Sequence, residues 1–262
     1  MNTTRALPAP LRVSQIVLIA SIAVSVAFLM ACAPKYYSSN SQNVPLLTQA
    51  GEGSASASIN PEANRVDVKT AVAVAPNFGL QANGALYFPR DEDSTGNGGT
   101  GGLFEVGAGY FRPLSYGLVF ETYALAAFGG VENHFPISAN DNPGTNGKLN
   151  ANLVRVALQP AVGFKQRNFE AALSTRIGML NYFNIDGNLV TGGENQQEYL
   201  RDHNVQFLAE PALTLRGGLD RIKIEAQLGI TINMGDQDFP QDDTWSSIGI
   251  VYFFDPISKS VR

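Results

Sequence analysis

The chain has 262 residues, of which 44% are hydrophobic and 16% are charged, with one cysteine, two histidines and a formal net charge of -5. One cysteine excludes a disulfide framework and a cysteine-rich zinc or iron–sulfur site, and two histidines leave little material for a histidine-based metal centre. The acidic balance argues against nucleic acid as a partner, because nucleic-acid binding needs a basic face. The length and apolar content fit one large all-β domain or two small ones.

The first residues have the pattern of an export signal. Arg5 and Arg12 precede an apolar run over 16–30, which is shorter than the roughly 20 residues of a membrane-spanning helix. The run ends in Leu29-Met30-Ala31-Cys32, which resembles the lipobox of bacterial lipoproteins. This resemblance implies cleavage before Cys32, a diacylglycerol on its thiol and an acyl chain on its new amine. An ordinary signal peptide with a chance cysteine is the alternative.

The same resemblance predicts the organisation of the N-terminal part. Residues 1–31 are expected to be a cleaved signal peptide, and residues 32–50 a lipidated cysteine followed by a polar tether. Ala33 stands where an Asp would imply retention in the inner membrane, so the lipoprotein rule points to the outer membrane. Acyl chains supply the membrane anchor, and outer-membrane lipid is the first expected partner.

From residue 51 onward, apolar and polar residues alternate, and no stretch shows the 3.6-residue period of an amphipathic helix. The alternation is clearest from Ile222 to Met234, where it continues for thirteen positions without an error. A period of two is typical of strands that bury one face. Ten segments have this pattern: 51–59, 65–75, 79–89, 104–112, 118–130, 153–165, 169–181, 205–216, 221–234 and 244–254.

The connections between these segments alternate in length. Short turns are expected at 75–78, 113–117, 165–168 and 217–220, and longer polar loops at 90–102, 132–148, 183–202 and 235–243. This rhythm is typical of an up-and-down antiparallel transmembrane β-barrel, with tight periplasmic turns and longer extracellular loops. We therefore predict a barrel of about ten strands over 51–254, both termini in the periplasm, and a periplasmic tail over 255–262.

The distribution of side chains favours a membrane barrel over a soluble, lipid-anchored binding barrel. The apolar face is nearly free of charge, and aromatic residues gather near its ends, as in the girdles at lipid headgroups. The aromatic residues expected near the short turns are Phe78, Tyr110, Phe120, Phe164, Phe169, Tyr252 and Phe254, and those near the long loops are Phe88, Phe104, Phe128 and Trp245. Pro160 and Pro211 interrupt two strands and are expected to mark β-bulges.

The chain resembles the lipoprotein-type outer-membrane β-barrel proteins of Bacteroidota. The resemblance covers the lipobox, the lead-in Gln42-Asn43-Val44-Pro45-Leu46-Leu47 with Gly51-Glu52, and the hairpins through Phe254. The end departs from the pattern, because many outer-membrane barrels finish on an aromatic residue of the last strand, whereas Asp255–Arg262 follow Phe254 here.

The polar face of the strands carries ionised groups of both signs. A ten-stranded barrel encloses a lumen only moderately wider than that of an eight-stranded barrel, so paired charges would fill it. A structural polar core is therefore expected, and a narrow small-solute channel is the alternative. Together with Glu52, the charges expected in the lumen are Asp67, Lys69, Glu105, Glu121, Arg155, Glu170, Arg176, Glu210, Arg216, Lys223 and Glu225.

Few residues of the sequence suggest catalysis or metal binding. A ten-stranded barrel invites comparison with the omptin proteases, for which the candidates are Asp91, Asp93 and the Asp202-His203 pair. Adjacent residues of a strand point to opposite faces, which disfavours the pair. Two loop groups carry oxygen ligands that suit Ca²⁺, but neither matches a complete calcium loop, and solvated surface charge is the preferred interpretation. The first loop group consists of Asp236, Asp238, Asp242 and Asp243, and the second of Asp141, Asn142 and Asn146.

We expect a barrel with a structural or interaction role in the cell envelope, as a possible subunit of a larger outer-membrane assembly. No enzyme activity, no small-molecule substrate and no cofactor beyond the acyl chains on Cys32 are expected. The first alternative is the narrow channel, and a surface protease and a soluble lipid-anchored barrel rank below it.

Overall fold

The computed structural model describes residues 34–60, 64–89, 97–136 and 144–254. Cys32 and the predicted signal peptide therefore lie outside the described residues. The same holds for the predicted tail over 255–262 and for Asp91, Asp93, Asp141 and Asn142.

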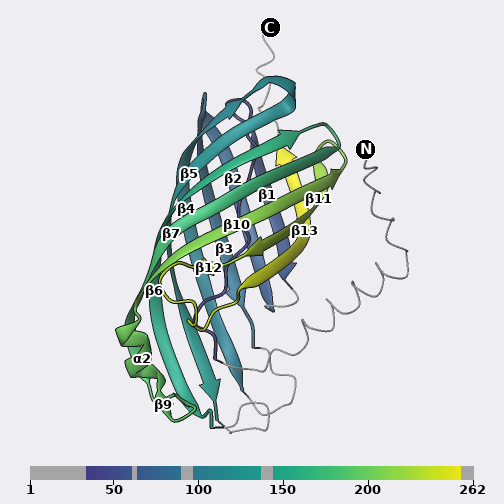
Figure 1. Cartoon of the computed structure of the whole chain (residues 1–262). Helices are drawn as coiled ribbons and strands as arrows, with labels where there is room; N and C mark the ends of the chain where they lie inside the picture. Colours follow the sequence, from purple (N-terminus) through teal and green to yellow (C-terminus); the bar gives the residue numbers. More distant parts are fainter. Residues whose placement is uncertain (1–33, 61–63, 90–96, 137–143, 255–262) are drawn as a thin grey trace, which may run out of the picture.

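A closed antiparallel β-barrel of ten strands forms the body of the protein (Figure 1). Each strand pairs with its neighbours in sequence, and β1 pairs with β13 to close the wall. The wall strands are β1 (Gly53–Asn60), β2 (Arg65–Ala75), β3 (Phe78–Tyr87), β4 (Gly98–Pro113), β5 (Leu118–Phe135), β6 (Gly147–Lys165), β7 (Phe169–Gly187), β10 (Val205–Gly218), β11 (Ile222–Ile230) with its continuation β12 (Ile232–Asn233), and β13 (Thr244–Phe254). The predicted fold class is confirmed.

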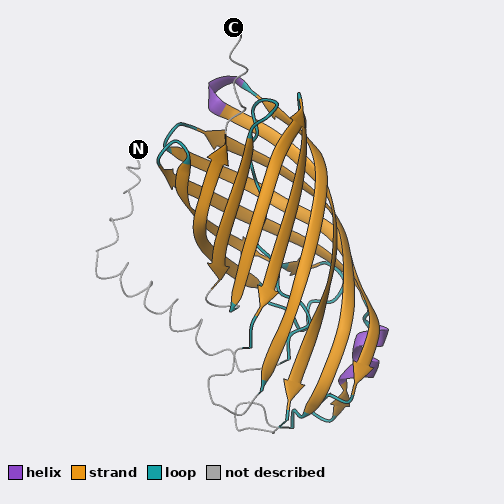
Figure 2. Cartoon of the chain, turned by 180° about the vertical axis from the view of Figure 1, so that it is seen from behind, coloured by secondary structure: helices purple, strands orange, loops and turns teal. Residues whose placement is uncertain are grey.

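Small elements mark the two ends of the barrel. The 3₁₀ turn η1 (Ser115–Gly117) lies between β4 and β5 at the end with the short turns. The hairpin of β8 (Val190–Thr191) and β9 (Glu194–Asn195) and the helix α2 (Gln196–Asp202) lie between β7 and β10 at the end with the long loops. Figure 2 shows these two ends at the top and the bottom of the barrel. No helix in the described part of the chain is long and apolar enough to cross a membrane.

The strands β4 to β7 are longer than the sequence pattern predicts, at 16 to 19 residues. The wall reaches Phe135 and resumes at Gly147, so both ends of the polar stretch that was expected to be a loop over 132–148 belong to strands. Where a barrel wall extends beyond the apolar band, residues no longer alternate between an apolar and a polar face. The period-two pattern therefore ends before the strand does.

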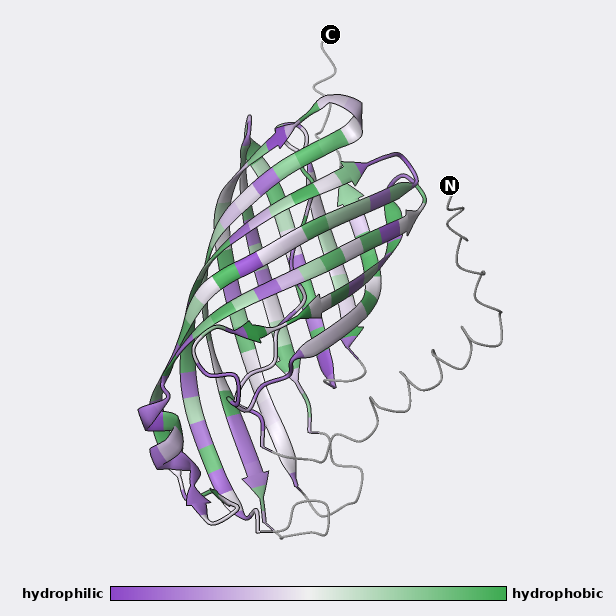
Figure 3. Ribbon diagram, viewed as in Figure 1, coloured by the Kyte–Doolittle hydropathy of each residue, from purple (hydrophilic) through white to green (hydrophobic). Residues whose placement is uncertain are grey.

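The wall presents apolar side chains outward and charged side chains inward. In β11, Ile224 and Leu228 are 61% and 60% exposed, whereas Lys223, Glu225 and Gln227 are at most 3% exposed. Green apolar and purple polar residues accordingly alternate along the strands (Figure 3). A wall of this kind faces hydrocarbon on its outside, and its closed sheet pairs the backbone N–H and C=O groups within the protein.

Trp245 does not belong to the outer aromatic girdle in which the sequence placed it. Its side chain is 2% exposed and lies in the lumen against Gly229, where an added Cβ would come within 2.3 Å of the indole. Alternate residues of a strand face the same side, so Trp245 lies on the inward face together with Val251 and Phe253, whereas Ile250 faces outward.

Pro160 and Pro211 do not form the expected bulges. Each proline interrupts the hydrogen-bond ladder to one neighbouring strand, β7 for Pro160 and β11 with β12 for Pro211, because proline has no N–H to donate. The register of the paired residues does not shift across either gap. The flanking pairs are Leu158 with Ile177 and Ala161 with Ser174 around Pro160, and Ala209 with Ile232 and Ala212 with Gly229 around Pro211. The register shifts that the described wall does contain lie between Ala73 and Ala75 and between Asn150 and Asn152.

Residues 36–47 of the predicted polar tether lie inside the barrel. We call residues 35–48 the lumen segment. Between Tyr36 and Leu47 every residue except Ser38 is buried. The segment begins at the long-loop end, where Tyr36 N–H donates to the Pro240 carbonyl, and it ends near the short turns, where Gly51 N–H donates to the Ala73 carbonyl. The sequence of this segment is polar because it hydrogen-bonds to a polar lumen.

The path of the lumen segment determines where the first and last described residues lie. An even number of strands places the start of β1 and the end of β13 at the same end of the barrel, and Gly53 indeed pairs with Phe254. The lumen segment then carries the chain back through the barrel before β1. Lys35 and Phe254, near the two ends of the described chain, therefore lie at opposite ends of the barrel.

Gly163 tests whether the lumen segment occupies the barrel. A Cβ at this position would come within 2.5 Å of Leu46 Cδ2. We expect Gly163→Val to destabilise the barrel by about 1–3 kcal/mol through overpacking, and Leu46→Ala to restore part of the loss in the double variant. Denaturant unfolding in detergent micelles measures this double-mutant cycle. Gly84→Val is the matched control, because Gly84 has open space around its Cβ position. Additive losses in the cycle would contradict the contact.

Candidate functional site: the filled lumen

Of the twelve charged residues that the sequence assigned to the lumen, eleven lie inside the wall and are at most 3% exposed, whereas Glu52 precedes β1 and its side chain is 13% exposed. These eleven come from seven of the ten wall strands, and most of them meet in two clusters at different depths. Asp67, Lys69, Glu105, Glu121, Arg155, Glu170, Arg176, Glu210, Arg216, Lys223 and Glu225 make up this set.

A central cluster joins two arginines to two glutamates from four strands. Arg155 Nη2 lies 2.5 Å from Glu105 Oε2, and Arg176 Nε lies 2.5 Å from Glu210 Oε2. Diagonal contacts of 3.8 Å between Arg176 and Glu105 and 4.0 Å between Arg155 and Glu210 complete the square. Such a fully paired group tolerates burial, whereas any member left alone would be a costly buried charge.

The lumen segment binds directly to this central cluster. Tyr37 Oη donates to Glu210 Oε1 at 2.8 Å, and Asn40 Oδ1 accepts from Arg155 Nη2 at 2.8 Å. The Ser39 hydroxyl also donates to Glu210. The lumen segment therefore supplies uncharged hydrogen-bond partners to Glu210 and Arg155 beside their ion pairs.

A second cluster of alternating charge runs toward the short turns. Lys69 Nζ lies 2.6 Å from Glu225, Arg216 bridges Glu225 at 2.7 Å and Glu170 at 3.0 Å, and Lys223 closes the row at 2.6 Å from Glu170. The Lys69–Glu225 pair joins β2 to β11, which are not neighbours in the wall. The lumen is thus bridged by side chains as well as by the lumen segment.

Gln42 fixes the middle of the lumen segment. Its backbone N–H donates to Gln227 Oε1 at 3.0 Å, and Gln227 Nε2 donates back to the Gln42 carbonyl at 2.7 Å. The Ser174 hydroxyl donates to Gln42 Oε1 at 2.7 Å. Next to it, Asn43 Nδ2 donates to Asn83 Oδ1 at 2.8 Å. This pattern is a sheet-like exchange of hydrogen bonds between an irregular chain and the wall.

Apolar contacts seal the segment at the short-turn end. Val44 and Leu46 pack with small wall residues, Ala161 and Ala172 among them. Lys165 Nζ donates to the Leu46 carbonyl at 2.9 Å.

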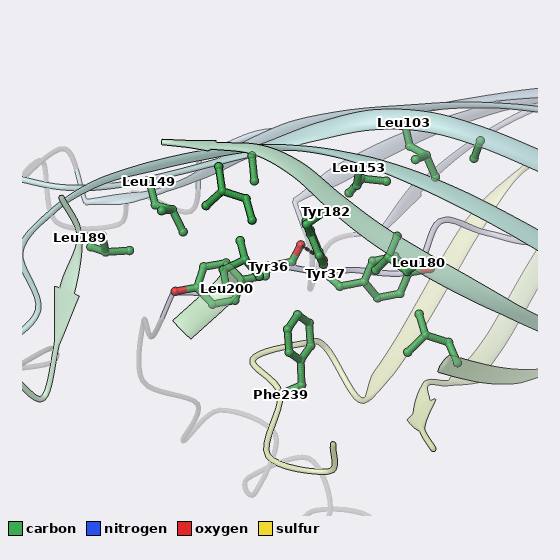
Figure 4. Packing of buried hydrophobic residues seen from close by; sticks show 14 of the residues in the cluster. Tyr36, Tyr37, Leu103, Leu149, Leu153, Leu180, Tyr182, Leu189, Leu200 and Phe239 are labelled. Carbon is green, nitrogen blue, oxygen red and sulfur yellow. Dashed lines mark hydrogen bonds between the residues drawn. The ribbon is translucent and has the colours of Figure 1, made fainter. Parts of the chain in front are cut away.

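An aromatic cluster covers the segment at the long-loop end. Tyr36 packs with Tyr182, Leu200 and Phe239, as Figure 4 shows. Tyr36 Oη donates to Gln196 Oε1 at 2.6 Å, and Tyr182 Oη donates to the Tyr36 carbonyl at 2.8 Å. The helix α2 and the loop before β13 thus close over the beginning of the lumen segment.

Sequence reasoning missed two charges and the whole lumen segment. Arg65 pairs with Asp67 at 2.9 Å, and Lys165 lies 3.4 Å from Glu52. The period-two pattern could have identified both, because Arg65 and Lys165 lie on the same polar face of their strands as the inward residues already assigned. With them, the described inward set is balanced at seven acidic and seven basic residues: Glu52, Asp67, Glu105, Glu121, Glu170, Glu210 and Glu225 against Arg65, Lys69, Arg155, Lys165, Arg176, Arg216 and Lys223.

Glu121 is the exception to this pairing. Its side chain is fully buried and forms no ion pair with another described residue, while the backbone N–H groups of Leu46 and Leu47 in the lumen segment lie beside its carboxylate. The neighbouring inward hydroxyl of Tyr123 is also unpaired within this part of the chain.

The predicted protease pair is not assembled in the described structure. Asp202 is exposed at the end of α2, whereas His203 Nε2 lies 3.8 Å from Asp236 Oδ2. The Tyr199 ring stacks on His203, and its hydroxyl donates to Asp236 at 3.3 Å. Burial, assisted by the Asp236 carboxylate, raises the pKa of Tyr199 to about 12, so this hydroxyl stays protonated. The group therefore orders the loops around α2.

The acidic loops do not form a cation site in the described structure. Within the described ranges, no group of three or more His, Cys, Asp or Glu side chains is arranged to hold a metal ion. The Asp236 carboxylate instead accepts from the Asp238 backbone N–H and the Tyr199 hydroxyl, and Asn146 pairs with Val190 in an isolated bridge.

Comparisons with known proteins identify no family. No family model matches the chain, and no curated protein matches it. Two solved structures are similar over most of the chain, each at 9% identity. The outer membrane enzyme PagL covers 78% of this chain and 99% of its own at a TM-score of 0.30, and the translocator domain of autotransporter NalP from Neisseria meningitidis covers 77% and 86% at 0.39. The fold described above therefore rests on the strands and registers of this chain itself.

Glu105 and Glu121 offer a matched test of the charge pairing. Glu105→Gln leaves Arg155 without its closest carboxylate, so we expect a loss of about 3–5 kcal/mol in the free energy of unfolding. Glu121→Gln removes a buried charge that has no ion-pair partner and keeps an amide oxygen that can accept from the nearby backbone, so we expect stability to stay the same or to rise. Urea unfolding followed by the fluorescence of the single tryptophan, Trp245, measures both. Equal losses in the two variants would show that pairing does not determine the stability of the lumen.

Proposed function

We propose that this protein is a lipid-anchored outer-membrane barrel, closed by its own N-terminal segment, with a structural or interaction role in the cell envelope. The observation that carries the proposal is the filled lumen. The lumen segment is buried along its length and joined to the wall by hydrogen bonds to Glu210, Arg155 and Gln227.

A closed lumen favours a structural role over the channel alternative. A conducting pore needs a continuous water-filled path with charges that an ion can approach. Here the charges of both clusters bind each other or the lumen segment. The barrel therefore acts as a membrane-embedded platform.

The interaction role is supported by the shape of the long-loop end. The strands β4 to β7 extend the wall on one side of the barrel, and α2 lies beside this extension (Figure 2). A one-sided wall above the apolar band offers a surface to a neighbouring envelope protein. We propose that the partner is a subunit of an outer-membrane assembly, and that the protein has no enzyme activity of its own.

The anchor is proposed from the sequence. Leu29-Met30-Ala31-Cys32 supports acylation of Cys32, in the manner of the Bacteroidota outer-membrane lipoproteins that the chain resembles. The exposed apolar band of the wall supports insertion in the outer membrane.

Conductance tests the closed lumen. We expect the full-length protein in planar bilayers to give no discrete current steps. A variant lacking residues 36–47 should conduct, because it exposes the inward charges to water. Heat-modifiable migration on a denaturing gel shows whether the deleted variant still forms a barrel, and Gly163→Val serves as a milder second variant that displaces the lumen segment. Discrete current from the intact protein would favour the channel.

Acylation is tested in cells that express the full chain. We expect incorporation of labelled palmitate that disappears in Cys32→Ser, and accumulation of the uncleaved precursor when signal peptidase II is inhibited by globomycin. Palmitate labelling of Cys32→Ser at the original level would contradict the proposed anchor.

A further inference from the structure

The lumen segment fixes the end of the barrel from which the preceding chain departs. Lys35 N–H donates to Asn133 Oδ1 at 3.3 Å, and Asn133 Nδ2 donates to the Lys35 carbonyl at 2.9 Å. Lys35 Nζ donates to the Gln241 carbonyl at 2.7 Å. Asn133 stands near the long-loop end of β5, and Gln241 belongs to the loop between β12 and β13. Lys35 is therefore held at the long-loop end.

The segment is held at both ends, so that it does not slide along the lumen. At its beginning, Tyr36 is packed under Phe239 and Tyr182. At its end, Thr48 N–H donates to Glu52 Oε2 at 2.7 Å, just before β1 enters the wall. Between them, Tyr37 and Gln42 bind the wall from inside.

Chain length limits how far an anchor can lie from Lys35. Cys32 precedes Lys35 by three residues, which span at most about 11 Å when fully extended. The apolar band of a membrane barrel is about 25 Å tall. A lipid on Cys32 cannot reach the leaflet at the short-turn end, and the lumen that would lead there is already occupied by the lumen segment.

We propose that the acyl chains on Cys32 insert into the leaflet at the long-loop end, so that the N-terminus of the mature protein lies at the cell surface. This is the outer leaflet, because short turns face the periplasm in barrels of this type. The inference rests on the proposed acylation of Cys32. It assigns to the lumen segment a function beyond closure of the barrel, since this segment carries the chain across the membrane inside its own barrel.

An epitope placed between Ala33 and Pro34 in the full chain tests the exit side. Two matched controls carry the same epitope in turns: between Gly192 and Gly193 at the long-loop end, and after Tyr116, which is 92% exposed at the short-turn end. We expect antibody to reach the N-terminal and Gly192 epitopes on intact cells, and to reach the Tyr116 epitope only after the outer membrane is permeabilised. An N-terminal epitope that behaves like the Tyr116 epitope would overturn the proposal.

The lipid itself is followed with a site for a specific protease in place of the N-terminal epitope. We expect protease added to intact cells to separate the palmitate label from the barrel, as seen on a gel. Retention of the label until permeabilisation would place the anchor on the periplasmic side and overturn the proposal.

Failure of acylation is distinguishable from failure of the exit side. If Cys32→Ser and the parent chain both lack palmitate, the anchor is wrong, while the N-terminal epitope still reports the exit side. If palmitate is present on Cys32 but the epitope is reached only after permeabilisation, acylation stands and the exit at the cell surface is wrong.

Discussion

Charge pairing inside the barrel is the constraint on which the rest of the structure depends. A wall that faces hydrocarbon must turn its polar residues inward, and the described lumen then holds seven acidic and seven basic groups, twelve of which are buried. Burial of such groups is tolerable only when they bind each other or other polar atoms. The lumen segment is polar and irregular for the same reason, since Tyr37, Asn40 and Gln42 complete hydrogen bonds that neighbouring strands cannot reach.

Much of the wall could be predicted from the sequence, because a strand between lipid and lumen alternates strictly. Ten strands and twelve inward charges follow from this period. The partners of those charges could not be predicted, since pairs such as Lys69 with Glu225 cross the lumen between strands that are not adjacent. The position of the lumen segment inside the barrel could not be predicted either, because serine, asparagine and glutamine are equally suited to a solvated tether and to a polar lumen. Trp245 shows the opposite case. Its position in the alternation indicates the inward face that it occupies, but its aromatic type suggested the outer girdle.

The outer and inner faces place different demands on small residues. Outside, proline is tolerated at Pro160 and Pro211 because the barrel keeps its register across each missing hydrogen bond. Inside, glycine makes room for large neighbours, as Gly229 does for Trp245 and Gly163 for Leu46. Alternation alone predicts which face a residue occupies, whereas close packing across the lumen determines whether that residue must be small.

The seam between β1 and β13 has a consequence for the order of assembly. These strands join residues nearly 200 positions apart, from Gly53 with Phe254 to Ile59 with Ile248, immediately after the lumen segment. A chain packed by Tyr36 at one end and Leu47 at the other cannot be drawn through a finished barrel. The wall must therefore wrap around residues that are synthesised first, and closure must wait for the strand that is synthesised last. Contacts of such high sequence separation form slowly, so we expect closure of the seam to be a slow step of folding.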